Sequence, residues 1–187
     1  MIRVACLSDV PAQPWKNGGG TTRELLAWPA ATDWALRLSV ARIETEGPFS
    51  AYPGISRWFA VLSGGGVELA WQDRTAQLAP GTAPLHFEGG DAPGCRLLNG
   101  PTEDLNLMLR NSRARGTLWP VPGDGACGGR GPWRGVYTAT ACTLHSGLNT
   151  PLPAHSLAWD DAATKPWRLS GSDRLRAWWI ELELTRP

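Results

Sequence analysis

The chain has little charge and no long apolar run, and each shortage excludes a class of protein. Charged residues make up 19% of the 187, and 18 Lys and Arg against 17 Asp and Glu leave a formal net charge of +1. Nucleic acids and anionic membranes attract clustered positive charge, so we expect neither as a partner. No stretch approaches the roughly 20 apolar residues of a membrane-spanning helix. Residues 1–6 lack the basic start and apolar run of a signal peptide, so we expect a cytoplasmic protein.

Histidine and cysteine are also scarce, which argues against a metal site. No two of His86, His145 and His155 are one or four residues apart, and the four cysteines include no C-x-x-C pair. The ligands of a preformed transition-metal site are usually closely spaced, so we expect neither a metal nor another cofactor. Because nothing indicates secretion, we expect the thiols to be free and buried.

Glycine and proline are abundant, with 22 and 16 residues spread along the chain, and this distribution indicates many tight turns. No segment carries a helical stripe over three turns. Short strands with turns between them predict an all-β sandwich or barrel. Since each half of the chain ends in an alternating strand, we favour two stacked β-barrels, with residues 110–135 as a linker or long loop. The main predicted strands are residues 34–41, 57–62, 67–71, 104–109 and 176–184.

Residues 16–23 contain the first candidate binding site. Three successive glycines at 18–20 let the backbone approach a ligand and point N–H groups at an anion. Lys16 and Arg23 flank them with positive charge, and Asn17 and Thr22 offer neutral hydrogen bonds. The alternative is an exposed turn, since runs of glycine usually form turns.

Two strands carry a polar minority face. Arg37 and Ser39 alternate with apolar residues in one strand, and Asp104, Asn106 and Met108 share a face of the other. In an open sheet such a face is solvated. In a small barrel it points inward, where a buried guanidinium needs a carboxylate from the protein or from a ligand. The sequence leaves both possibilities open.

His86 is the remaining candidate for chemistry, because it lies in a short predicted strand and can act as a general base. The alternative is an ordinary strand histidine that bonds to the backbone. The sequence contains no G-x-S-x-G nucleophile elbow and no dinucleotide-binding glycine fingerprint after a strand. Nothing in the residues themselves requires catalysis.

Three ordered motifs resemble those of the HutD/Ves family. They are PWKNGGGTTREL at 14–25, residues 34–39 followed by EGPFSAYPGISR at 46–57, and GPTEDLNLM at 100–108. The resemblance is specific over about residues 12–110, and the second half resembles the family only in layout. It implies a bicupin, in which two stacked antiparallel β-barrels of the RmlC-like jelly-roll type share one chain. On that layout an N-terminal cupin barrel with the ligand pocket covers residues 1–112, of which 1–12 can pair with the second barrel. A degenerate second barrel covers residues 113–187.

The resemblance also implies where a ligand binds. Metal-dependent cupins carry two His and a Glu in their first motif, whereas residues 47–64 contain no histidine, so the resemblance is to a cupin without a metal. The pocket residues carried over from the three motifs are Lys16, Asn17, Thr22, Arg23, Arg37, Ser39, Phe49, Ser50, Tyr52, Arg57, Asp104, Asn106 and Met108.

The function implied by the resemblance is metal-independent binding of a small metabolite, with a role in regulating histidine utilisation. The expected partner is a small carboxylate such as urocanate or N-formylglutamate, held by Arg37 or Arg23. We expect a binding protein rather than an enzyme. The alternative is a metal-free cupin isomerase or lyase acting on a small carboxylate, in which His86 or Tyr52 moves a proton near Arg37. A homodimer is compatible with either function.

Overall fold

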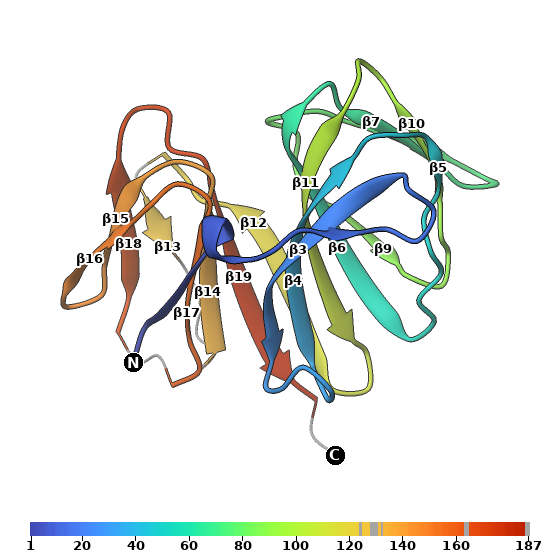
Figure 1. The fold of residues 1–187 in the computed structure, drawn as a ribbon. Helices are drawn as coiled ribbons and strands as arrows, with labels where there is room; N and C mark the ends of the chain where they lie inside the picture. Colours follow the sequence, from blue (N-terminus) through green and yellow to red (C-terminus); the bar gives the residue numbers. More distant parts are fainter. Residues whose placement is uncertain (124, 128–130, 132, 163–164, 186–187) are drawn as a thin grey trace. The chain divides into compact units, whose positions relative to one another are not determined.

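Short strands joined by turns make up most of the chain in the computed structural model, as Figure 1 shows. The structure describes residues 1–123, 125–127, 131, 133–162 and 165–185. Within these ranges the helical content is a single 3₁₀ turn, η1 (Leu7–Asp9), so the prediction of an all-β protein is confirmed. No helix in the described ranges has the length and apolar character needed to cross a membrane.

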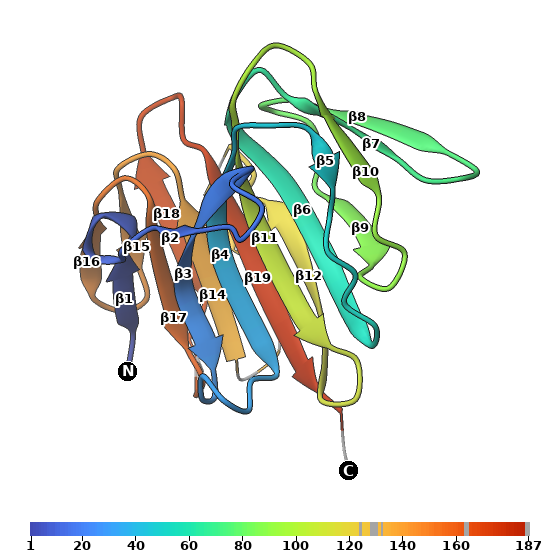
Figure 2. The same ribbon diagram turned by 45° about the vertical axis from the view of Figure 1, so that its right-hand side comes forward.

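The contacts divide the chain into two units, and the first consists of Val10–Arg115 together with Thr185. It contains a six-stranded antiparallel sheet and a four-stranded one, which Figure 2 shows as a separate layer beside β6 and β9. The strands of the larger sheet, in spatial order, are β2 (Gln13–Pro14), β3 (Gly20–Trp28), β4 (Leu36–Ile43), β11 (Thr102–Arg110), β6 (Ile55–Gly64) and β9 (Leu85–Glu88). Those of the smaller sheet are β5 (Gly47–Pro48), β10 (Gly94–Leu97), β7 (Val67–Ala70) and β8 (Thr75–Leu78).

The core of the first unit joins its two sheets. Apolar side chains of β4, β6 and β9 pack with those of β7, β8 and β10 in one cluster. The partly buried Trp15 and Phe49 pack against this cluster. Strand alternation explains the choice of residues, because every second side chain of a strand faces the same way. The fully packed members are Ile43, Phe59, Val61, Val67, Leu69, Leu78, Phe87 and Cys95.

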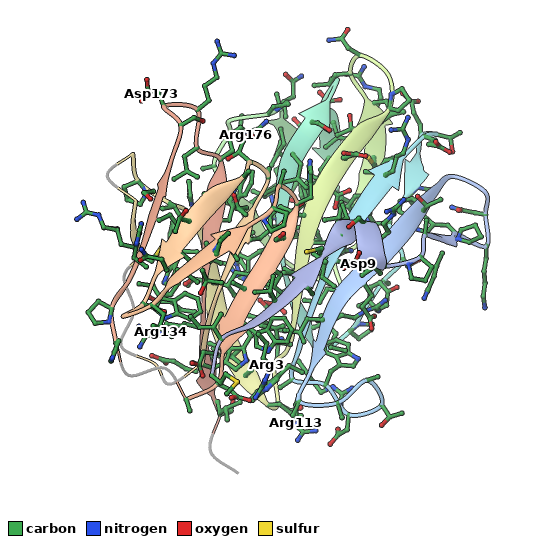
Figure 3. The ribbon with its side chains drawn as sticks, turned by 60° about the vertical axis from the view of Figure 1, so that its left-hand side comes forward. Arg3, Asp9, Arg113, Arg134, Asp173 and Arg176 are labelled. Carbon is green, nitrogen blue, oxygen red and sulfur yellow. The ribbon has the colours of Figure 1, made fainter. Side chains whose placement is uncertain are left out.

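The second unit consists of Met1–Asp9 and Gly116–Leu184. Its sheets are ordered β1-β17-β14-β19-β12 and β13-β18-β15-β16. Arg3 on β1, labelled in Figure 3, binds Asp161 with two hydrogen bonds of 3.0 Å next to the β1–β17 pair. The strands are β1 (Arg3–Cys6), β12 (Ala114–Pro120), β13 (Ala126–Cys127), β14 (Trp133–Thr138), β15 (Cys142–His145), β16 (Asn149–Leu152), β17 (Ser156–Asp160), β18 (Trp167–Gly171) and β19 (Ala177–Leu184).

The prediction of a linker or long loop at 110–135 is wrong. β12, β13 and the start of β14 lie in this stretch, although residues 124, 128–130 and 132 are outside the described residues. Glycine and proline separate very short strands there, so the averaged composition resembled that of a loop.

Proline also occurs inside a strand of the second unit. Pro151 lies within β16, which is an edge strand of its sheet, where a residue without an N–H group is tolerated.

Candidate ligand-binding cavity

A cavity of about 550 Å³ opens in the first unit, over one face of its six-stranded sheet. Twelve of the thirteen predicted pocket residues line it, contributed by the loop before β3, by strands β3, β4, β6 and β11, and by the segment after β5. These twelve are Lys16, Asn17, Thr22, Arg37, Ser39, Phe49, Ser50, Tyr52, Arg57, Asp104, Asn106 and Met108.

Strand register explains why the polar residues meet. β11 lies between β4 and β6, and residues that are directly opposite in neighbouring strands point to the same side of the sheet. The polar minority faces of β4 and β11 therefore fall on one side, and they line the cavity. The three rows across β4, β11 and β6 are Arg37–Met108–Arg57, Ser39–Asn106–Phe59 and Ala41–Asp104–Val61.

Arg23 is the predicted residue that does not line the cavity. It follows Thr22 on β3, and successive side chains of a strand point to opposite faces, so only one of the two can face the cavity. Arg23 instead lies opposite Val40, a buried residue on the apolar side of β4. The cavity lining therefore does not include Arg23, which the sequence motif suggested as a pocket residue and as a cationic anchor.

The glycine loop is a hydrogen-bonded turn rather than an open anion cradle. The Gly18 N–H donates to the carbonyl of Trp15, and the Gly19 N–H donates to Asn17 Oδ1, both at 3.0 Å. Gly18 adopts a φ of +71°, which favours glycine, and a Cβ at Gly20 would lie 2.1 Å from a backbone oxygen of β4. The loop therefore brings the side chains of Lys16 and Asn17 to the cavity, while these two N–H groups are used internally.

Several lining residues were not predicted, and Trp15 is the most informative. Its Nε1 donates a 2.7 Å hydrogen bond to Thr22 Oγ1, which leaves the hydroxyl hydrogen of Thr22 available for another acceptor. Trp15 lies inside the first sequence motif but is not among the predicted pocket residues. The other unpredicted lining residues are Gln13, Pro14, Ala41, Ile43 and Pro48.

Arg37 lines the cavity and already forms an ion pair with Glu24. Its Nε donates to Glu24 Oε2, and both side chains are partly exposed. Glu24 lies next to Arg37 because a bulge in β3 shifts the register between Glu24 and Leu26. A guanidinium with a carboxylate partner has less need of a ligand carboxylate, which weakens the case for Arg37 as the anchor.

Arg57 is the buried cation of the cavity. Its side chain is 5% exposed, and its guanidinium carbon lies 5.1 Å from the ring centres of Phe49 and Phe87 and 5.8 Å from that of Tyr52. Such distances favour cation–π attraction. Burial lowers the pKa of Arg57, an effect that Asp104 opposes, but a guanidinium keeps its proton in proteins. Arg57 takes part in none of the ion pairs among the described residues.

Asp104 is the buried acid of the cavity. It is 1% exposed, and its Oδ1 has no hydrogen-bond partner among the described residues. Burial raises the pKa of Asp104 to about 8, Arg57 works against this, and Glu103 adds to it. At neutral pH the side chain is therefore held mainly as the neutral acid. Asn106 lies on the same face of β11 and accepts a long hydrogen bond, 3.4 Å, from Arg57 Nε.

His86 lies outside the cavity. It pairs with Trp58 across β9 and β6, its Nε2 is 2.7 Å from Ser56 Oγ, and its ring centre is 4.9 Å from that of Trp58. Trp58 and Arg57 are successive residues of β6, so they face opposite sides of the sheet. Among the described residues, no group of three or more His, Cys, Asp or Glu side chains is arranged to hold a metal ion.

Comparison with known proteins indicates the same family as the three sequence motifs. A family model described as HutD matches residues 7–171. A 21.2 kDa protein of the hutC 3′ region of Pseudomonas putida is 37% identical over 113 residues, which are 59% of each chain, and the protein Ves of Citrobacter koseri is 35% identical over 111 residues, 58% of each. The chain thus spans about three fifths of the length of these relatives.

Similar solved structures extend the likeness over the whole chain. The structure of HutD from Pseudomonas fluorescens matches with a TM-score of 0.86 and 29% identity, and all of both chains is covered. Oxalate decarboxylase of Bacillus subtilis, over 95% of this chain and 76% of its own, gives a TM-score of 0.64 at 10% identity, which is a likeness of fold alone.

Proposed function

The chain belongs to the HutD family, and on that premise we propose that the cavity of the first unit binds a small carboxylate metabolite without a metal ion. We infer further that each unit is a cupin-type β-barrel. The two-sheet construction of each unit and the fold likeness to oxalate decarboxylase support this interpretation.

The observation that carries the proposal is Arg57. Burying a charge is costly unless an opposite charge or good hydrogen bonds accompany it, and aromatic rings replace only part of the lost hydration. A ligand carboxylate beside Arg57 would supply the missing counter-charge in a geometry that suits a guanidinium. Arg57 is therefore a better anchor than Arg37, which already holds Glu24.

The rest of the lining is consistent with a small organic acid. Ser39, Asn106 and Thr22 offer neutral hydrogen bonds, while Phe49 and Met108 provide an apolar wall. Pockets for small molecules typically combine such a wall with a few polar groups that fix the ligand's orientation. Lys16 at the exposed rim adds positive charge at the entrance.

The proposed role of the bound metabolite is to modulate the histidine-utilisation pathway. The Pseudomonas putida relative is named for its position in the hutC 3′ region, and this supports a ligand from that pathway. Urocanate and N-formylglutamate are the first two candidates. The isomerase or lyase alternative gains no support from His86, which lies outside the cavity.

The test is calorimetric titration of the protein with urocanate and N-formyl-L-glutamate in the presence of a chelator. Arg57→Met should weaken binding by about 30-fold or more, because truncating one partner of a buried charge pair costs about 2–5 kcal/mol. Methionine suits the surrounding rings, so the variant should keep its β-sheet circular dichroism. The matched control is Arg74→Met, which removes an exposed arginine outside the cavity.

Two results would contradict the proposal. One is that neither compound binds to the wild-type protein. The other is that folded Arg57→Met binds as tightly as the wild type, since the ligand would then not depend on the buried guanidinium.

A further inference from the structure

We propose that Asp104 acts in the cavity as a neutral acid that donates its hydrogen to the ligand's carboxylate, so that ligand binding is linked to the proton on this side chain. The inference rests on the proposed function. It assigns Asp104 the task of selecting a carboxylate ligand.

The geometry leaves Asp104 with an unmet bonding requirement. Its side chain lines the cavity and is almost fully buried, and its Oδ1 has no hydrogen-bond partner among the described residues. An unpaired buried polar atom is costly, and such atoms in native proteins usually have a specific reason. A ligand atom in the cavity is the partner that this position lacks.

The position of Asp104 fits a carboxylate that is shared with Arg57. Asp104 and Asn106 are on the same face of β11, and Asn106 accepts the hydrogen bond from Arg57 Nε. The acid, the amide and the guanidinium therefore follow one another along one side of the cavity. Arg57 and Asp104 both line the cavity and form no ion pair with each other, so the proposed ligand carboxylate would contact both of them.

The charges around Asp104 favour its neutral form. The one cation that acts on it from β6 is Arg57, and Glu103 on its own strand opposes Arg57. Its register partners on β4 and β6 are Ala41 and Val61, which carry no charge. Other titratable groups of the cavity lining are Arg37 of β4 with its partner Glu24 of β3, Lys16 of the exposed loop, and Tyr52 of the segment after β5. Beside them, Arg42 of β4 pairs with Glu103, and burial raises the thiol pKa of Cys95 of β10 to about 12.

A ligand carboxylate strengthens this preference. Two carboxylates that share one site cannot both ionise easily, so one proton is retained between them. The O–H···O⁻ bond that results is of the short, charge-assisted kind. Where free Asp104 is already protonated, the ligand meets the acid directly. Where Asp104 is ionised, above about pH 8, binding must take up one proton from solvent.

The first experiment needs no ligand. The side-chain carboxyl carbon of Asp104 is followed by ¹³C NMR between about pH 3 and pH 10, and Asp104→Asn identifies the signal. We expect a midpoint near pH 8. A midpoint near 4, the ordinary value for an aspartate, would overturn the inference even if the proposed function holds.

The second experiment measures the linkage with N-formyl-L-glutamate, whose own carboxylates ionise near pH 4 and do not titrate in the range used. Calorimetry in two buffers with different heats of ionisation should give almost no proton uptake at about pH 6 and close to one proton per ligand at about pH 9. The affinity of the wild type should fall about tenfold per pH unit above 8, while that of Asp104→Asn should not follow pH. Asp73→Asn, at an exposed site outside the cavity, should behave as the wild type.

The results separate the two proposals. If N-formyl-L-glutamate and urocanate both fail to bind, the proposed function fails, and the NMR midpoint alone decides whether Asp104 is a neutral acid. If binding occurs without proton uptake at about pH 9 and Asp104→Asn abolishes it, Asp104 acts as an ionised acceptor for a ligand N–H group, and the inference is wrong.

Discussion

Replacing Asp104 by asparagine should change how the free energy of unfolding depends on pH. The pKa of Asp104 is about 8 in the folded protein and about 3.9 in the unfolded chain. Between these values the folded state keeps a proton that the unfolded state has lost. Stability must therefore fall as pH rises, by about 1.4 kcal/mol per pH unit, and level off above pH 8. The side-chain amide introduced by Asp104→Asn does not titrate, so the variant lacks this slope. Over the whole interval the free energy of unfolding of the variant should gain about 6 kcal/mol relative to that of the wild type.

Urea unfolding of both proteins between about pH 5 and pH 8 measures this difference. The other titrating groups are common to both proteins, so their contributions cancel in the difference between the two stability curves. Asp73→Asn is the control, because its exposed carboxylate should leave the curve parallel to that of the wild type. Parallel curves for Asp104→Asn would refute the reasoning, since they would mean that Asp104 ionises as easily in the folded protein as in the unfolded chain.

Three smaller predictions concern the packing around the cavity. Gly20→Ala should lower stability in urea by more than about 1 kcal/mol, because its Cβ would lie 2.1 Å from a backbone oxygen; an unchanged midpoint would mean that the strands separate easily. Thr102→Val should cost about 1–3 kcal/mol, since the buried Gly66 N–H would lose its 2.9 Å acceptor, whereas Thr102→Ser should retain most of the stability. Cys95, whose thiol pKa burial raises to about 12, should react with a thiol reagent far more slowly than partly buried Cys6, and equal labelling rates in the native protein would contradict this.

Alternation along single strands was enough to predict much of the first unit. The polar side chains of β4 and β11 were identified from their period of two, because that period is a local property of the sequence. Alternation alone did not show which face points into a cavity, and that prediction came from the family resemblance. Which face does so depends on β11 lying between β4 and β6, and a pairing between strands so distant in the sequence leaves no local signal.

The bonding state of each charged side chain was also beyond the sequence. Arg37 and Arg57 appear equivalent in a list of motif residues, yet a bulge in β3 brings Glu24 to the first, and three aromatic rings enclose the second. The unpartnered oxygen of Asp104 depends in the same way on which side chains its neighbours present. Such differences arise from register and packing, which alternation does not specify.

The pairing of β1 with β17 has a consequence for the order in which the chain folds on the ribosome. All ten strands of the first unit lie within residues 10–115, so that unit can close while the rest is still being made. β1 emerges before it but has no partner until residues 156–160 follow, roughly 10–30 s later at ordinary rates of synthesis. During that interval its backbone groups are open to incorrect pairing, and the shortness of β1 and the charge of Arg3 are features that limit such pairing. The second unit, although it contains β1, is therefore completed after the first.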